Sequence, residues 1–162
     1  MRIKLAFVAA IAAVATVFVA PTAALAAPDG LACSAAGSYS RIIFGQPTTF
    51  WLVGSVGNYR YWHVVLPDGS GGETYSRSYV VLCSGDTISS STDLSVTSTS
   101  GDRCGTTSTN EFQYVGVHSH VVHLGQFVLI YNYRYWHVKR FVTFGSFGFW
   151  IYDHSELARC LF

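Results

Sequence analysis

The heptapeptide NYRYWHV occurs twice in this chain, at residues 58–64 and again, without one change, at residues 132–138. Seven matching residues that include the rare Trp and His are improbable by chance in a chain of 162 residues. Self-similarity of this kind is typical of a duplicated structural unit. The repeat therefore predicts two related units. An isolated reused strand is the alternative, because the copies are barely alike outside the heptapeptide.

The four cysteines flank the two copies of the heptapeptide at similar distances. Cys33 and Cys83 enclose its first copy, and Cys104 and Cys160 enclose the second. An even number of cysteines without C-x-x-C spacing favours two disulfides over metal-binding or catalytic thiols. Duplication favours the pairs Cys33–Cys83 and Cys104–Cys160, and closing each loop of about 50 residues would stabilise its unit by roughly 4 kcal/mol. The nested alternative pairs Cys83 with Cys104 and Cys33 with Cys160.

These spacings define candidate modules at residues 33–83 and 104–160. The tract between them, residues 84–103, is rich in Ser and Thr and has almost no large apolar residue. A tract of that composition predicts a linker or a mobile loop.

The start of the chain has the three-part pattern of a cleavable signal peptide. Arg2 and Lys4 form a short basic region, and residues 5–20 are apolar and uncharged. Ala24 and Ala26 are the small residues that a signal peptidase requires. Cleavage is therefore expected after Ala26.

Two other roles for this leader are disfavoured. An uncleaved membrane anchor would need about 20 apolar residues, whereas the run here has 16 and ends in a proline. Acylation of Cys33 as a lipoprotein is disfavoured because Leu31 lies two residues before the cysteine, one residue closer than a lipoprotein signal places its leucine. We predict that residues 1–26 are removed and that residues 27–162 form a secreted, extracellular domain.

Removing the leader changes the formal charge from +1 to −1, because eight basic residues then remain against nine acidic ones. No basic surface for phosphate groups is expected, so the sequence predicts no nucleic-acid binding and no membrane binding after signal cleavage. The partner classes left open are a glycan, a cell-wall polymer or another extracellular protein. The Ala/Val-rich leader and the single lysine of the mature chain are typical of exported bacterial proteins.

The mature chain is dense in aromatic residues, Val, Thr, Ser and Gly, a mixture that favours β-strands. Residues 48–56, 59–66 and 74–82 form strand-like runs separated by turn signals, the first of which is Gly57-Asn58. Similar runs continue through the second half, where residues 155–159 are a candidate for a short helix. The prediction is an all-β fold, a small disulfide-bonded antiparallel sandwich or barrel. Two duplicated β-meander modules are one arrangement that would form it.

Alternation along a strand divides the heptapeptide into two faces. Trp62 and Val64 lie on one face, which we expect in the core. The other face is expected to be partly exposed, because Lys139 continues it in the second copy. Its tyrosine rings could stack on a sugar while the histidine forms a hydrogen bond, or they could cover a half-buried strand. This hypothetical ligand platform consists of Tyr59, Tyr61, His63, Tyr133, Tyr135 and His137.

Three histidines lie close together in the second half of the chain. The H-x-H spacing places His118 and His120 on one face of a strand, an arrangement that zinc and iron sites use. His123 falls on the opposite face, and no acidic residue follows closely to complete a metal site. We therefore expect histidines without a metal ion, and no cofactor.

The sequence contains no motif of established catalytic machinery. It has no G-x-S-x-G, no H-E-x-x-H and no phosphate-binding glycine loop. Asp68, Glu73, Asp153 and Glu156 could pair as acid and base only if the fold brings two of them together. We therefore do not expect an enzyme.

Three classes of function fit the remaining features. A secreted, non-catalytic binding module fits the small size, the disulfides and the aromatic residues best. A surface-active or self-assembling coat protein is the first alternative, because residues 127–131 and 141–152 combine high β propensity with no charge. A secreted inhibitor of another protein is the second alternative, acting through loops such as residues 67–73 or 84–103.

Overall fold

The computed structural model of the chain describes residues 28–98, 102–105 and 107–161. The expected leader, residues 1–26, lies outside these residues, so its cleavage stays a prediction. Within the described residues, no helix has the length and apolar character that crossing a membrane requires.

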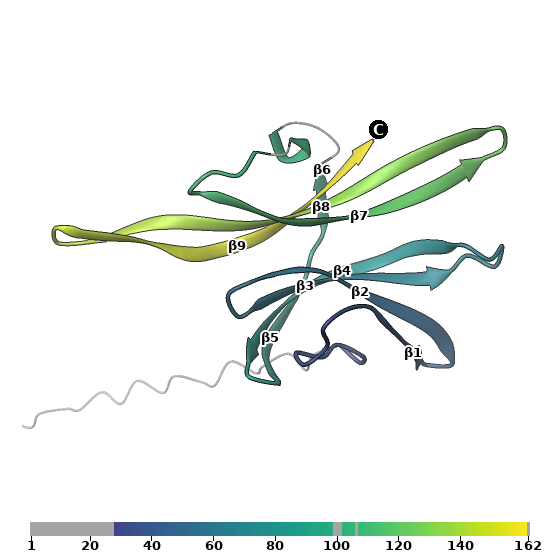
Figure 1. Cartoon of the computed structure of the whole chain (residues 1–162), viewed down its shortest axis with the longest axis horizontal. Coiled ribbons are helices and arrows are strands. Elements are labelled where there is room, and N and C mark those ends of the chain that lie inside the picture. The colour runs from purple at the N-terminus through teal and green to yellow at the C-terminus, as the bar shows by residue number, and fades with distance from the viewer. Residues whose placement is uncertain (1–27, 99–101, 106, 162) are drawn as a thin grey trace, which may run out of the picture.

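The described chain forms two β-sheets that pack against each other (Figure 1). The first sheet is antiparallel, in the order β1-β2-β3-β4-β5, and consists of β1 (Tyr39–Ile43), β2 (Gln46–Val56), β3 (Tyr59–Pro67), β4 (Glu73–Ser84) and β5 (Thr87–Asp93). The second has the order β6-β9-β8-β7 and consists of β6 (Val96–Ser98), β7 (Phe112–Leu124), β8 (Phe127–Phe144) and β9 (Phe147–Leu161). Strand β6 runs parallel to β9, and the other pairs are antiparallel. The expected all-β, disulfide-bonded fold is confirmed.

Tight two-residue turns join the strands of most hairpins, whereas residues 68–72 form a longer connection between β3 and β4. Gly57 begins the turn between β2 and β3 with a φ of 55°, and Gly145 begins the turn between β8 and β9 with a φ of 61°. A positive φ at the first turn position is what a type II′ hairpin needs, and glycine adopts it without a Cβ clash. The turn expected at Gly57-Asn58 is confirmed.

The disulfides join Cys33 to Cys83 and Cys104 to Cys160. Both pairs agree with the modular prediction, and the nested alternative is wrong. Cys83 lies in β4 and Cys160 in β9, so each disulfide ties the third strand of a meander to the segment that precedes that meander. Each sheet is therefore cross-linked separately.

The Ser/Thr-rich tract at residues 84–103, expected to be a linker or mobile loop, contains two strands. Strand β5 extends the first sheet by pairing with β4, and β6 pairs with β9 of the second sheet. Ladder hydrogen bonds use backbone groups, and Ser and Thr side chains tolerate an exposed sheet edge, so low hydrophobicity does not prevent strand formation. Residues 155–159, the expected helix candidate, lie in β9 for a related reason, because β8 supplies a pairing partner.

The two heptapeptides occupy the central strands β3 and β8 and have the same pairing register. His63 lies opposite Ser78 of β4, and His137 lies opposite Ser155 of β9. A bulge interrupts the preceding strand pair in each sheet. Each copy is therefore the middle strand of a three-stranded meander, β2-β3-β4 or β7-β8-β9. A common origin of these meanders by duplication stays a prediction.

Both faces of the repeated strand are buried. Trp62 and Val64 belong to a core cluster that includes the Cys33–Cys83 disulfide. The expectation that this face lies in the core is therefore confirmed. The opposite, tyrosine-bearing face contributes to a second cluster that forms between the sheets.

Candidate metal centre

The Tyr/Tyr/His face of the heptapeptide lies between the two sheets, so the expectation that it is partly exposed is wrong. The exposed fraction is 0% for Tyr61, His63 and Tyr135. The alternation of side chains along a strand predicts which residues share a face, but it does not predict what packs on that face. In the folded protein the second sheet covers it. These rings offer no open surface for stacking on a ligand. The buried members of the expected platform are Tyr61, His63, Tyr133, Tyr135 and His137, and Tyr59 is half-buried.

A hydrogen-bond chain crosses between the sheets at His63. The hydroxyl of Tyr135 in β8 lies 2.7 Å from Nδ1 of His63 in β3 and 2.5 Å from Oγ of Ser78 in β4. All three residues are fully buried, so the chain pairs polar atoms that would otherwise be buried without a partner. It also orients the His63 ring, whose Nε2 is directed at β7.

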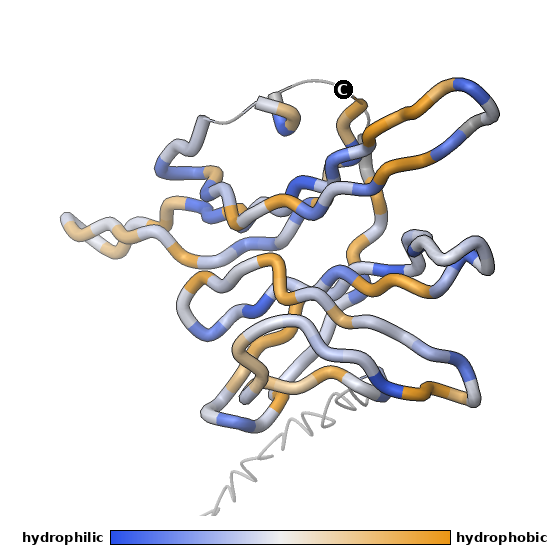
Figure 2. The backbone as a smooth tube through the Cα atoms, turned by 45° about the vertical axis from the view of Figure 1, so that its right-hand side comes forward, coloured by the Kyte–Doolittle hydropathy of each residue, from blue (hydrophilic) through white to orange (hydrophobic). Residues whose placement is uncertain are grey.

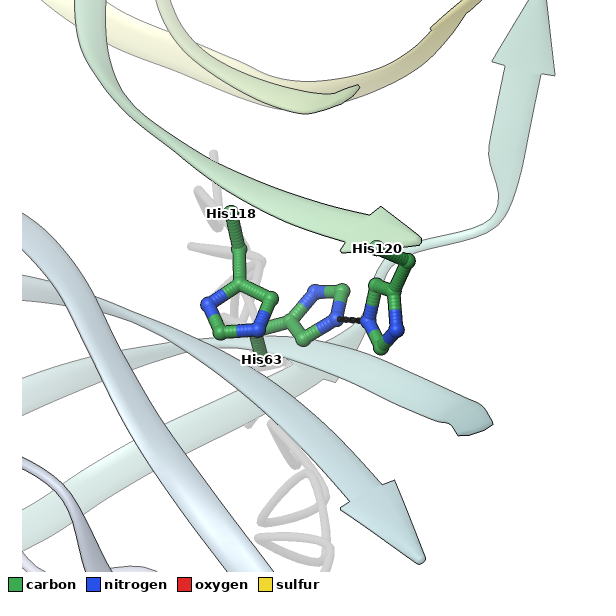
Figure 3. A group of neighbouring side chains, drawn as sticks. All are labelled: His63, His118 and His120. Carbon is green, nitrogen blue, oxygen red and sulfur yellow. Dashed lines mark hydrogen bonds between the residues drawn. The ribbon is translucent and has the colours of Figure 1, made fainter. Parts of the chain in front are cut away.

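His63 meets two histidines of β7 (Figure 3). Its Nε2 lies 2.5 Å from Nε2 of His120, and its ring stacks on that of His118 with the ring centroids 4.2 Å apart. The three histidines each offer a nitrogen that lies within 4.8 Å of the other two. His118 and His120 both contact His63 and therefore share a face, as their spacing predicts, whereas His123 is exposed and lies outside this group.

Burial keeps these imidazoles neutral. It lowers the pKa of His63 to about 2, and charge repulsion from His118 and His120 adds to the shift. Burial, followed by His120, lowers the pKa of His118 to about 4. Burial also lowers the pKa of His120, although a backbone hydrogen bond to Glu73 and the charge of Glu73 oppose this shift. All three rings thus lack a second proton at neutral pH, and neutral imidazole is the form that binds a metal ion.

A pocket of about 430 Å³ gives access to this cluster from solvent. Its walls include His118 and His120, together with Asp68 from the segment that joins β3 to β4 and Glu73 at the start of β4. Asp68 accepts hydrogen bonds from the hydroxyl and the backbone N–H of Ser70, which lower the pKa of its carboxyl group. The entrance therefore carries negative charge and attracts cations.

His137, the counterpart of His63 in the second meander, has the same hydrogen-bond chain but different neighbours. Its Nδ1 lies 2.7 Å from the hydroxyl of Tyr61, which lies 2.8 Å from Oγ of Ser155. The rings of Tyr59 and Tyr152 pack against it, with centroids 5.2 and 4.8 Å away. This histidine is therefore enclosed by tyrosines rather than by histidines.

The difference between the surroundings of His63 and those of His137 arises from the length of the β7–β8 hairpin. In the first sheet, Val56 pairs with Tyr59 and the chain then turns. The equivalent pair in the second sheet is His118 with Tyr133, and the ladder continues beyond it. His120 lies in this extension, so the longer β7–β8 hairpin supplies the histidines that reach His63.

The sequence predicts His63 as part of the ligand platform and gives no link between His63 and the pair His118 and His120. Strand spacing relates residues within one strand, whereas 57 positions separate His63 from His120 and they belong to different sheets. The only local signal was the H-x-H pair itself. The third histidine becomes visible only when the sheets are packed together.

A larger hollow, of about 870 Å³, lies over the second sheet. Trp136, Trp150 and Arg103 contribute to its walls. Arg103 is already ion-paired with Glu156 at 2.5 Å, and its backbone carbonyl accepts a hydrogen bond from Trp136 Nε1 at 2.9 Å. No cluster of metal-binding side chains is found there among the described residues. The three histidines are therefore the stronger candidate site.

Comparison with protein-family models, curated proteins and solved structures finds no significant match to this chain. No relative therefore assigns a ligand or a reaction to the histidine cluster. Its role has to be inferred from the positions and chemistry of His63, His118 and His120.

Proposed function

We propose that this protein is an exported, non-catalytic binding protein whose ligand is a divalent transition-metal ion held by His63, His118 and His120. The observation that carries the proposal is the convergence of these imidazoles, from two different sheets, to within 4.8 Å of one another. Three histidines with a fourth position left open are a known ligand set for Zn²⁺. The sequence-based expectation of a binding module is kept, and its ligand is revised to a metal ion.

Coordination requires only side-chain adjustments. A tetrahedral Zn²⁺ with Zn–N bonds of about 2.0–2.1 Å places its nitrogen ligands roughly 3.3 Å apart. The Nε2 atoms of His63 and His120 would therefore separate from their present 2.5 Å. The ring of His118, which stacks on His63, would turn about its Cβ–Cγ bond to direct a nitrogen at the same ion. This turn is feasible because His118 borders the pocket.

The hydrogen bond to Tyr135 supports metal binding by selecting the nitrogen of His63 that binds. When Nδ1 of His63 donates its proton to the Tyr135 oxygen, Nε2 is left unprotonated and free to coordinate. Tyr135 then donates its own proton to Oγ of Ser78. A partner of this kind fixes the tautomer and the ring orientation of a metal ligand.

The donor set points to particular ions. Imidazole nitrogen suits Zn²⁺, Cu²⁺ and Ni²⁺, whereas Ca²⁺ and Mg²⁺ take oxygen ligands. All four cysteines are in disulfides, so no thiolate is present to favour Cu⁺. The pocket, with Asp68 and Glu73 in its walls, would supply water or a carboxylate for the open position. We expect one ion per chain, with Cu²⁺ bound more tightly than Zn²⁺.

Export is part of the same proposal. It is supported by the leader pattern in residues 1–26 and by the two disulfides, which form and persist in oxidising compartments. Amino-terminal sequencing of protein recovered from the culture medium should start at Ala27. Full-length protein that stays inside the cell would contradict this part of the proposal.

The metal proposal is tested by calorimetric titration of chelator-treated protein with Zn²⁺ and with Cu²⁺. One site per chain is expected in the wild type. Loss of a ligand in His118→Ala or His120→Ala should weaken binding at least about tenfold, since even outer partners of metal ligands contribute that much. His154→Ala is the control, because His154 is exposed, lies in β9 and is outside the walls of the pocket, so the affinity should stay unchanged.

Two results would reject the metal site. The first is a wild-type protein that binds neither ion, and the second is a His120→Ala variant that binds as tightly as the wild type. Disulfide mapping and the urea midpoint of each variant show whether it is folded. His137→Ala adds a second control, because it removes the equivalent histidine of the other meander, which packs against tyrosine rings.

A glycan ligand is the second candidate, favoured by the hollow over the second sheet. Trp150 is 41% exposed there, and Asn110 and Glu111 offer hydrogen-bonding groups for sugar hydroxyls. Trp150→Ala should then reduce retention on cell-wall polysaccharide, while Phe44→Ala, at another exposed aromatic residue, should not. Equal retention of both variants would exclude this candidate.

A further inference from the structure

The β8–β9 hairpin projects from the body of the protein and exposes an unusual concentration of aromatic side chains (Figure 1). Residues 141–152 contain no charged residue. Exposed aromatic rings in such number are rare on a protein that stays in water, and they mark a contact surface. The exposed fractions are 52% for Phe141, 82% for Phe144, 77% for Phe147, 53% for Phe149 and 41% for Trp150.

This apolar surface is preformed. The ladder of β8 and β9 continues to its last pair, Phe144 with Phe147, and closes in the tight turn at Gly145. The ring of Phe141 packs against Trp150, with centroids 5.2 Å apart. Folding therefore leaves these rings outside the core on an ordered ribbon.

The hairpin is apolar on both of its faces. Paired residues of adjacent strands point to the same side, so Phe144 and Phe147 share one face. Phe141 and Trp150 share the other face. A groove in a partner protein covers one face of a ribbon, whereas a fluid apolar phase covers both faces and the tip. The distribution of rings therefore favours lipid as the occupant.

Polarity changes in order along the hairpin. Behind the phenylalanine tip lies the pair of Phe141 and Trp150, and the charged residues begin at the next ladder pair, where Arg140 lies opposite Ile151. Arg140 Nε is 3.2 Å from Asp153 Oδ1 in an exposed ion pair. Lys139 lies next to Arg140 on the same strand. The order from the tip is therefore phenylalanine, then Trp150, then the cationic residues at the level of Ile151 and Tyr152. This order suits a bilayer, from its hydrocarbon through its interface to its phosphate groups.

The length of the apolar ribbon fits one leaflet. Four ladder steps separate the pair of Phe144 and Phe147 from the pair of Arg140 and Ile151. At about 3.4 Å per step this is roughly 14 Å, about half of the hydrocarbon thickness of a bilayer. Among the described residues, no third strand pairs with residues 141–152. The outer backbone groups of this ribbon also favour shallow insertion, where water and headgroups can bind them.

We propose that residues 141–152 form a lipid anchor that inserts into one leaflet of a bilayer. The anchor is independent of the metal site, which lies between the sheets. It revises the expectation of no membrane binding, which considered only charge. The β7–β8 hairpin also contains hydrophobic residues near its tip (Figure 2), and Phe127 in it is exposed. This hairpin carries His123, however, and ends on the opposite side of the molecule from the β8–β9 hairpin (Figure 1).

The experiment is flotation of the mature, disulfide-bonded protein with vesicles of phosphatidylcholine and with vesicles that also contain phosphatidylglycerol. Wild-type protein should float with both, and brominated lipid should quench its tryptophan fluorescence through Trp150. Phe144→Ser should lower partitioning at least about tenfold, because a large apolar side chain is lost from the tip. Phe44→Ser is the matched control, since Phe44 is 95% exposed at the tip of the β1–β2 hairpin and should have no effect.

Three outcomes would overturn the anchor. Wild-type protein that floats with neither vesicle has no lipid contact of this kind. Binding only to anionic vesicles, unchanged in Phe144→Ser, would assign it to charge rather than to the hairpin. A lipid-free dimer in analytical ultracentrifugation that Phe144→Ser dissociates would make a second copy of this chain the occupant. Because Phe144 is exposed, unfolding midpoints should stay equal and exclude misfolding as the cause.

Discussion

A Cβ atom at Gly54 would lie 2.7 Å from the carbonyl oxygen of Val115, so the backbones of β2 and β7 touch where the two sheets cross. The contact is reciprocal, because a Cβ atom at Gly116 would lie 2.6 Å from the carbonyl oxygen of Val53. At these distances each position has room for the hydrogen atom of a glycine but not for a Cβ atom. The separation of the sheets, and with it the distance between His63 and β7, depends on these two glycines.

Gly54→Ala and Gly116→Ala should each destabilise the protein. The atom that obstructs the new methyl group is backbone and cannot rotate away, so the sheets must shift, at about 1–3 kcal/mol of unfolding free energy. Urea denaturation of chelator-treated protein measures the change. Gly37→Ala is the control, because a methyl group at this position would meet nothing within 4 Å and should change the stability by less than about 0.5 kcal/mol. Equal midpoints for all three variants would contradict the close approach.

Tyr135→Phe should reduce both stability and metal affinity. Without the hydroxyl, Nδ1 of His63 and Oγ of Ser78 lose their shared partner in a buried site, at about 1–3 kcal/mol. The unsupported His63 should bind Zn²⁺ about 10–100-fold more weakly. Tyr131→Phe is the control, because Tyr131 contacts Arg159 through its ring, which phenylalanine keeps. Unchanged Zn²⁺ affinity in Tyr135→Phe would show that Tyr135 does not position His63.

The metal-free protein should lose stability as the pH falls from about 6.5 towards 4. Burial, followed by the charge of Lys139, lowers the pKa of His137 to about 4, whereas the unfolded chain titrates near 6.5. Between these values the unfolded state binds a proton that the folded state does not, so acid favours unfolding. The slope should reach about 1.4 kcal/mol per pH unit for each such histidine. Well above pH 6.5, His137 is unprotonated in both the folded and the unfolded state, so its contribution to stability is constant.

The measurement is urea denaturation at several pH values across this range. His137→Gln should show a shallower loss of stability than the wild type, because one of the buried histidines no longer titrates. The slope should not vanish, since burial also lowers the pKa of His118. An identical slope in the variant and the wild type would contradict the assignment to His137.

Removal of either disulfide should lower stability by about 2–5 kcal/mol. The bonds close separations of 50 and 56 residues, so the constraint on the unfolded chain is similar in the two cases. The variants are Cys33→Ser with Cys83→Ser and Cys104→Ser with Cys160→Ser, each compared with the wild type by urea denaturation. A double variant with the wild-type midpoint would show that its disulfide is not needed for stability.

Local signals in the sequence predicted much of the framework. The meander over residues 48–82 and the turn at Gly57 follow from alternation and turn chemistry, which act over a few residues. The pairing of Cys33 with Cys83 followed from the repeat. The strands β5 and β6 within the expected linker, and the strand at residues 155–159, were not predicted, because strand formation there depends on a neighbouring strand that composition does not reveal.

The sequence by itself determined the all-β class and the two faces of the repeated strand, and it favoured the disulfide pairs that the structure contains, because period-two alternation and cysteine spacing are properties of the chain. Only the tertiary structure decided what covers each face. The second sheet buries Tyr61 and Tyr135, which belong to the hypothetical ligand platform. The same packing brings His63 to within 2.5 Å of His120, because two sheets in contact join residues whose separation along the chain carries no information about distance.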